Sequence, residues 1–208
     1  MNFDEFCVTY NTDKSSKSHN FCEFYDKNLN LKNVKSLLEI GVKHGASLKS
    51  WAGYIPDAAI HGMDSSKKIA YQCRKENGEP KTECLGFPNI EIDYTDQNSK
   101  EQLKNSIGEK MFDLIIDDGG HKVDQQQNTL ETYWSHINPG GAFIMEDLHT
   151  SYSKSHQADG YETTVDYLLK NQLHLNNFKE IRCNFDTQDL PESRNNHMTC
   201  IIYKKEVD

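Results

Sequence analysis

Residues 112–149 read FDLIIDDGGHKVDQQQNTLETYWSHINPGGAFIMEDLH, and this stretch decides the fold. The runs FDLII and AFIM are short and continuously apolar, which is typical of parallel strands buried on both faces. A segment of helical length separates the two runs, so the stretch predicts one βαβ unit. Both runs end in acidic residues, at the carboxyl edge where open α/β sheets bind their ligands. The residues expected at that edge are Asp117, Asp118, Glu146 and Asp147.

These acidic residues predict a cation site. Carboxylates crowded at one edge repel one another unless a cation or protons neutralise them. Neighbouring strands lie roughly 5 Å apart, so carboxylates at the same height can share one ion, and oxygen ligands suit Mg²⁺ or Ca²⁺. His121 follows Asp118 by three positions and can exchange protons near neutral pH. The alternative is that Asp117 and Asp118 cap the next helix and that His121 is a surface residue.

Composition limits the class of protein. The 208 residues suffice for one domain with a sizeable core. With 23 Lys and Arg against 32 Asp and Glu, the formal net charge is −9, which argues against nucleic acid as the main partner. No apolar run approaches the roughly 20 residues that span a membrane, and the start MNFDEFCVTY lacks the pattern of a signal peptide. The six cysteines form no CxxC pair, so we expect a cytoplasmic protein with reduced, mostly buried thiols.

Strand and helix patterns alternate from Val34 onward, which predicts an α/β fold with a mostly parallel sheet. The strands expected before FDLII are SLLEIG (36–41), AAIHGMD (58–64) and NIEID (89–93). Helices are expected near 48–55, near 69–73, after the capping residue Ser99, and over 123–137. The runs NNFKEIRCNFD and HMTCIIYKK, separated by TQDLPESRNN, predict an antiparallel pair at the sheet edge. The globular domain is expected over 34–208, after an arm at 1–33 with a helix near 20–30.

The turn EIGVKHGASLKSW (39–51) is a second candidate site. Glycines in a strand-to-helix turn let the backbone approach a ligand closely, although a tight turn also needs them for its own shape. The spacing is ExGxxxG, so the dinucleotide fingerprint GxGxxG is absent. Asp64 ends the next strand, where a carboxylate can accept both hydroxyls of a ribose. Asp93 ends the third strand and is a candidate for the adenine side, but a strand-end aspartate often serves only a turn.

The segment TYNTDKSSKSHNFCEFY (9–25) precedes the first strand and is rich in polar residues. With His19 it could form a lid over the cleft. Composition is equally consistent with a solvated N-terminal arm.

Together these residues resemble a known family, the class I S-adenosylmethionine-dependent methyltransferases. Within it they look most like the metal-dependent O-methyltransferases that act on sugars, such as macrolide deoxysugars and some surface glycans. The matching segments are TDK…H (12–19), LLEIGVKHGASLKSW (37–51), FDLIIDDGGH (112–121) and NPGGAFIMEDLHTSY (138–152). DDGGH together with IMEDLHTSY is specific, whereas EIG is generic. The family usually has DDGSH where this chain has Gly120.

The resemblance implies a Rossmann-like seven-stranded sheet of order 3-2-1-4-5-7-6, with the last strand antiparallel and helices on both faces. It implies His121 as general base, and Asp118, Glu146 and Asp147 as ligands of Mg²⁺ or another divalent cation. It implies S-adenosylmethionine as cofactor, with Thr12, Asp13 and Lys14 in a lid that covers it. The residues expected around the cofactor are Glu39, Gly41, Gly45, Asp64, Asp93 and Asp117, of which Asp117 has no defined role beyond capping.

The expected reaction is transfer of the sulfonium methyl group to a sugar hydroxyl, whose pKa the metal lowers while His121 takes the proton. The expected partner is a sugar or glycan such as rhamnose, without nucleic acid or membrane insertion, and a homo-oligomer is left open. Three alternatives remain: a catechol-type O-methyltransferase, a non-catalytic glycan-binding module, and a nicotinamide oxidoreductase, which the missing GxGxxG disfavours.

Overall fold

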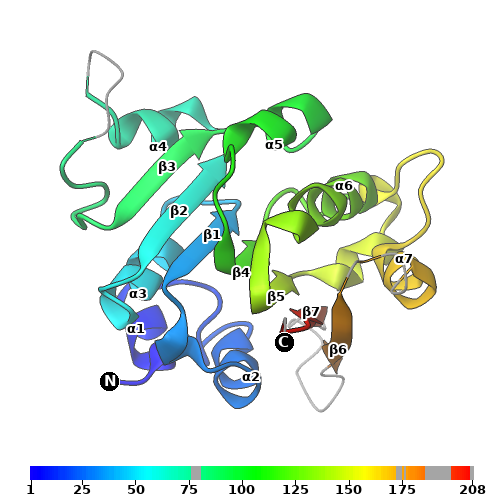
Figure 1. Ribbon diagram of the computed structural model, residues 1–208, viewed down its shortest axis with the longest axis horizontal. Helices are drawn as coiled ribbons and strands as arrows, with labels where there is room; N and C mark the ends of the chain where they lie inside the picture. Colours follow the sequence, from blue (N-terminus) through cyan, green and yellow to red (C-terminus); the bar gives the residue numbers. More distant parts are fainter. Residues whose placement is uncertain (76–80, 172–174, 176, 186–197, 207–208) are drawn as a thin grey trace. The chain divides into compact units, whose positions relative to one another are not determined.

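The computed structural model describes residues 1–75, 81–171, 175, 177–185 and 198–206 (Figure 1). Its strands form a seven-stranded sheet of order β3-β2-β1-β4-β5-β7-β6, as predicted. β7 runs antiparallel to both of its neighbours, which confirms the antiparallel last strand. The strands are β1 (Ser36–Ile40), β2 (Ala59–Asp64), β3 (Ile90–Tyr94), β4 (Phe112–Asp117), β5 (Ile137–Met145), β6 (Phe178–Phe185) and β7 (Met198–Lys204).

The described chain also contains seven α-helices and four short 3₁₀ helices, of which α1, α2 and η1 precede β1. The α-helices are α1 (Phe3–Thr9), α2 (Phe21–Asn28), α3 (Ala46–Tyr54), α4 (Lys67–Gln72), α5 (Lys100–Ser106), α6 (Val123–Tyr133) and α7 (Thr164–Asn171). The 3₁₀ helices are η1 (Leu31–Asn33), η2 (Trp134–His136), η3 (Leu148–Tyr152) and η4 (Lys154–His156). None of the described helices is long and apolar enough to cross a membrane. The helices α1 and α7 and the 3₁₀ segments after β5 are additions to the sequence prediction.

The chain divides into two compact units, of which the first is Met1–Asp96. Its strands β1, β2 and β3 pair in parallel, and α4 packs on β2 and β3 (Figure 1). Helix α1 packs on α3, where the ring of Phe3 stacks on that of Trp51 with centroids 3.8 Å apart. Both rings are fully buried, so the arm at 1–33 contributes to the core of this unit.

The second unit is Gln97–Asp208, and it contains the stretch 112–149 that predicted the βαβ unit. Strands β4 and β5 pair in parallel, and α6 packs against both. β5 begins at Ile137, five residues before the predicted AFIM, because the segment NPGG also joins the strand. A Cβ at Gly141 would lie 2.7 Å from the carbonyl oxygen of Asp113, so the close approach of the two strands requires glycine there. The predicted loop TQDLPESRNN lies outside the described residues.

Helix α6 buries polar side chains where a helix against a sheet usually buries apolar ones. The buried polar positions are Gln125, Gln126, Gln127, Asn128 and Thr129. Gln126 Nε2 donates to the carbonyl of Glu146 at 3.0 Å, and Gln127 Nε2 donates to that of Glu162 at 2.8 Å. Directional hydrogen bonds therefore hold α6 to several loops of its unit, in addition to the packing of its apolar residues.

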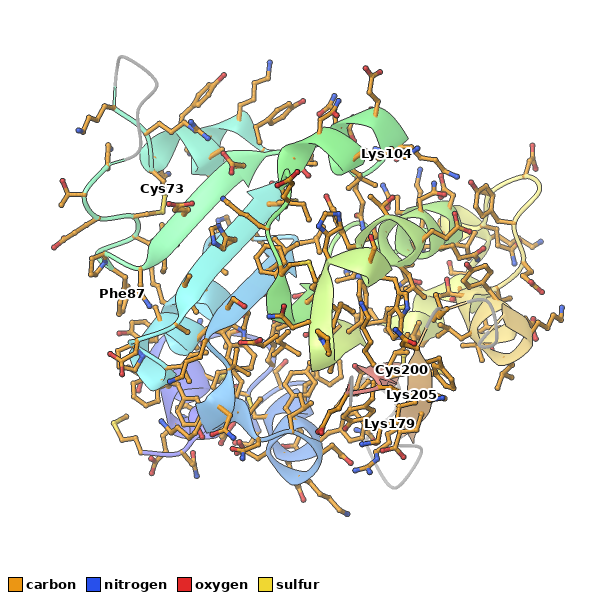
Figure 2. The ribbon with its side chains drawn as sticks, in the orientation of Figure 1. Cys73, Phe87, Lys104, Lys179, Cys200 and Lys205 are labelled. Atoms are coloured by element: carbon orange, nitrogen blue, oxygen red, sulfur yellow. A yellow bond between two sulfur atoms is a disulfide. The ribbon has the colours of Figure 1, made fainter. Side chains whose placement is uncertain are left out.

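A disulfide joins Cys73, at the end of α4, to Cys84 (Figure 2). The expectation of reduced thiols is therefore wrong for these two residues. Their Cα atoms are 4.6 Å apart, within the range that a disulfide spans. Cys84 also forms an isolated antiparallel β-bridge with Phe87. The other four cysteines are not part of a disulfide, and three of them are buried, as expected: Cys7, Cys22 and Cys200.

Loss of this disulfide should destabilise the protein. The two cysteines are 11 residues apart, and closing a loop of this length in the unfolded chain stabilises the fold by about 3 kcal/mol. We expect Cys73→Ser and Cys84→Ser each to lower the free energy of unfolding in urea by about that amount. The control is the wild-type protein in a dithiol reductant, which should match the two variants. Equal stability of oxidised and reduced wild type would contradict the prediction.

Candidate functional site

Asp117, the last residue of β4, is fully buried and does not cap the following helix. The N-cap position of α6 is Lys122, so the capping alternative is wrong for both aspartates before it. The carboxylate of Asp117 instead accepts hydrogen bonds from Gln97 Nε2, at 2.9 and 3.1 Å, and from the N–H of Gly119, at 3.2 Å. Burial raises the pKa of Asp117 to about 7, although the bond from Gln97 opposes that shift.

The next residues form a group with metal-ligand spacing. One ligand atom each of Asp118, His121 and Asp147 lies within 4.8 Å of the others. His121 Nε2 is 3.8 Å from Asp118 Oδ1 and 3.5 Å from Asp147 Oδ2. All three side chains are mostly buried, with 22%, 20% and 14% of their surface exposed for His121, Asp118 and Asp147. The structure thus brings together three residues that the sequence assigned to the metal and the base.

The backbone at two of these residues is unusual. His121 has φ +57° and Asp147 has φ +55°, the left-handed region that residues other than glycine seldom adopt. Such conformations persist only where the surroundings impose them, and they cluster at functional sites. One restraint is Thr150, whose Oγ1 donates to the carbonyl of His121 at 2.9 Å and to that of Asp147 at 2.8 Å. A single hydroxyl therefore ties the two strained residues together.

Glu146, the third expected metal ligand, is almost fully buried. Its N–H donates to the carbonyl of Asp117 at 3.0 Å, and its own carbonyl accepts from Gln126. Among the described residues its carboxylate is not part of the group of ligand atoms within 4.8 Å. His149 lies on the other side of Asp147, with Nδ1 3.8 Å from Oδ1.

The donor set fits a hard divalent cation. Two carboxylates, Asp118 and Asp147, face the same imidazole, and carboxylate oxygens are the protein ligands that Mg²⁺ prefers. Zinc sites use mostly nitrogen and sulfur ligands, and no described cysteine belongs to this group. The residues present are therefore suited to Mg²⁺, with positions left for water or a hydroxyl ligand.

The glycine turn of the first unit is shaped by Asp64. Asp64 Oδ2 accepts from the N–H groups of Val42 and Lys43 at 2.9 and 2.8 Å, and Oδ1 accepts from that of Ser66 at 2.6 Å. A carboxylate offers about four acceptor positions, so about one remains for a ribose hydroxyl. Asp64 thus fixes the turn itself, a role that the sequence reading missed.

The glycines of this turn have backbone conformations that side chains rarely allow. Gly41 has φ +92° and Gly45 has φ +75°. A Cβ at Gly45 would also lie 2.3 Å from Leu85 Cδ1, so this position is closed to larger residues on two grounds. Lys43, between them, has φ +54° as well.

Lys14 and Glu39 form a buried ion pair. Lys14 Nζ is 3.7 Å from Glu39 Oε1, and both side chains are essentially inaccessible to solvent. Lys14 is thus a buried partner of Glu39, although the sequence placed the two in different elements, a lid and a strand end. Thr12 is also buried, and its hydroxyl donates to the exposed Asp13 at 3.4 Å.

Asp93, the adenine candidate, forms an ion pair with Arg74. Both side chains are about one-third exposed. The residues that the sequence reading missed are the amides Gln97, Gln125 and Gln126, which bond to the loops carrying Asp118 and Glu146. Nothing in their local sequence distinguishes them from surface glutamines.

The chain matches a protein-family model described as a methyltransferase domain over residues 38–148, more than half of its length. A similar curated protein is the 8-demethyl-8-alpha-L-rhamnosyl tetracenomycin-C 2'-O-methyltransferase of Streptomyces olivaceus, 29% identical over 65% of this chain and 35% of that protein. The mycinamicin VI 2''-O-methyltransferase of Micromonospora griseorubida is 29% identical over 71% of this chain and 36% of that protein. The chain therefore spans about a third of the length of these relatives.

A similar solved structure is the methyltransferase MycE in complex with Mg, SAH and mycinamycin VI. It superposes with a TM-score of 0.73 at 23% identity, over 99% of this chain and 55% of MycE. This likeness establishes the fold, including the strand order.

The buried Asp117 should make stability depend on pH. Its pKa is raised from 3.8 to about 7 in the folded state, so its contribution to stability is complete below pH 4 and is lost as pH rises through 7. A shift of about three units corresponds to roughly 4 kcal/mol at most. We expect the free energy of unfolding of Asp117→Asn, measured by urea titration with chelator present, to lack this decline.

The free energy of unfolding of Asp117→Asn should therefore increase relative to that of wild type as the pH rises from 4 to 8. Parallel pH profiles of the two proteins across that window would contradict the prediction.

Proposed function

We propose that this chain, which belongs to the S-adenosylmethionine-dependent methyltransferase family, transfers a methyl group to a sugar hydroxyl with the help of a divalent cation. The observation that carries the proposal is the grouping of Asp118, His121 and Asp147 past the ends of β4 and β5. The acceptor class is supported by the relatives named as rhamnosyl and mycinamicin O-methyltransferases.

In this proposal Asp118 and Asp147 hold Mg²⁺, with Glu146 as the third carboxylate. Bound Mg²⁺ supplies Lewis-acid chemistry, which lowers the pKa of a hydroxyl group placed beside it. The low exposure of Asp118 and Asp147 strengthens their interaction with a cation, because little water screens the charges. Two neighbouring hydroxyls of a pyranose would fit such a site, which favours a 2- or 3-hydroxyl as the methylated group.

His121 acts as the general base. Because Mg²⁺ prefers oxygen ligands, the imidazole of His121 remains available for the proton, within 4 Å of both carboxylates. As the bond between the hydroxyl oxygen and the methyl carbon forms, the bond between that carbon and the sulfonium sulfur breaks, and His121 Nε2 takes the proton.

The cofactor is assigned to residues of the first unit. S-adenosylmethionine supplies the electrophilic methyl group when bound. Gly41 and Gly45 let the backbone approach it, and Asp64 offers its remaining acceptor position to a ribose hydroxyl. The Lys14–Glu39 pair fixes the end of β1, with Thr12 and Asp13 beside it. Asp93 is proposed for the adenine side.

An acceptor assay tests the function as a whole. We expect label from methyl-labelled S-adenosylmethionine to pass to rhamnose-containing oligosaccharides or glycosides, detected by mass spectrometry, and chelator to abolish the transfer. Transfer to catechol instead would indicate a small-molecule enzyme of the catechol type. Absence of cofactor binding in calorimetry would indicate a binding module and refute the proposal.

Substitution of His121 tests the mechanism. His121→Ala should lower kcat by about 10²–10⁴-fold, the usual contribution of a general base, while the Kd for S-adenosylmethionine stays within about twofold of wild type. Asp159→Asn, an exposed carboxylate of the same unit, is the matched control and should keep full activity. Near wild-type turnover in His121→Ala would remove His121 from the proposed role.

A further inference from the structure

The loop between β4 and α6 is held by two glutamine side chains that the proposed reaction does not use. We propose that Gln97 and Gln125 are positioning residues, which fix the backbone of residues 118–121 and thereby the relative placement of Asp118 and His121. This inference rests on the proposed function, because it assigns the glutamines to the metal and proton site described above.

Gln97 bonds to three separate parts of its unit. Its Nε2 donates to both oxygens of Asp117 and, at 2.9 Å, to Thr129 Oγ1 on α6. Its Oε1 accepts from the N–H of Gly120 at 2.9 Å. The side-chain nitrogen of Gln97 cannot accept a hydrogen bond, so the N–H of Gly120 must face Oε1. This bond therefore fixes the orientation of the Gln97 amide. Gln97 is only 7% exposed, so water competes little for these bonds.

Gln125 forms hydrogen bonds at the other end of the loop, where α6 begins. It stands in the first turn of α6, and its Oε1 accepts from the N–H of Lys122 at 3.2 Å. Its Nε2 donates to Oδ1 of Asn98, the residue after Gln97, at 2.8 Å. The segment 97–98 and the start of α6 are therefore joined across the loop that carries His121.

The two glycines of the loop leave the space that these amides fill. A Cβ at Gly119 would lie 2.3 Å from Gln97 Oε1, and a Cβ at Gly120 would lie 2.1 Å from Gln125 Oε1. Neither glycine has a positive φ, so the backbone itself would accept an L-residue. The three atoms nearest to each Cβ belong to the amide of the glutamine, so an added methyl group would displace that amide. This packing also gives a reason for Gly120 at the position where the resembling family has serine.

The bonds act on the geometry of the site. Only Gly119 and Gly120 separate Asp118 from His121, and His121 must hold a left-handed conformation. A loop with two consecutive glycines has many alternatives to that conformation when it is free. A misplacement of about 1 Å at a reacting group can cost about 10²-fold in rate, so the restraint bears directly on function.

Binding of Mn²⁺, as a spectroscopic substitute for Mg²⁺, tests the inference without any acceptor. We expect Gln97→Ala to weaken Mn²⁺ binding about tenfold or more in electron paramagnetic resonance. In the separate acceptor assay, Gln97→Ala should lower kcat and leave the KM for S-adenosylmethionine nearly unchanged. Gln127→Ala is the matched control: it removes a buried glutamine of α6 that bonds to the carbonyl of Glu162 instead. Gln127→Ala should keep wild-type Mn²⁺ affinity, whereas Asp118→Asn should lose it.

The glycine positions provide a second variant. Gly119→Ala should weaken Mn²⁺ binding as Gln97→Ala does, because the new methyl group displaces the amide. The double variant should bind no worse than Gln97→Ala, since alanine at 97 leaves room for the methyl group. Additive losses, or wild-type affinity in Gln97→Ala, would overturn the inference.

Hydrogen exchange separates this inference from the proposed function. The amide of Gly120 should exchange at least tenfold faster in Gln97→Ala than in Gln127→Ala, with or without metal. If wild type binds no Mn²⁺, the metal site of the proposed function fails, and the exchange comparison still decides whether Gln97 holds the loop. Equal exchange in the two variants would refute that role.

Discussion

The parallel register of β4 and β5 sets the position of the acidic residues at the ends of these two strands. Asp117 lies opposite Met145, and the N–H of Glu146 donates to the carbonyl of Asp117. Asp118 and Asp147 then leave the two strands at the same edge, close enough to share an ion. A shift of one residue would move each side chain to the opposite face of the sheet, so the carboxylates could no longer converge.

The residues alone predicted much of this arrangement. β4 and part of β5 appeared as continuous apolar runs, because strands covered on both faces have no polar side to reveal. The meeting of Asp118 with Asp147 followed from the strand ends in the same way. The order of the strands did not follow from the residues, since apolar runs carry no information on which strand lies beside which, and it came from the family resemblance.

What the sequence could not provide are contacts between distant residues that lack a local signature. The disulfide of Cys73 with Cys84 depends on how the chain returns to α4, and cysteine spacing alone gives no sign of it. Lys14 is a polar residue in a polar segment, yet it is buried against Glu39 because the ion pair compensates its charge. Asp117 was read as a cap because strand-end aspartates often are, whereas tertiary burial gives it a raised pKa.

The side chain of Gln97 occupies the space beside Gly119, so a substitution at one of these positions affects the other. A larger residue at 119 would displace the amide of Gln97. A smaller residue at 97 would remove the acceptor of the Gly120 N–H and the bonds from Gln97 to the carboxylate of Asp117. Neither position can drift alone. The absence of side chains at Gly119 and Gly120 therefore matches the space that the amides of Gln97 and Gln125 occupy.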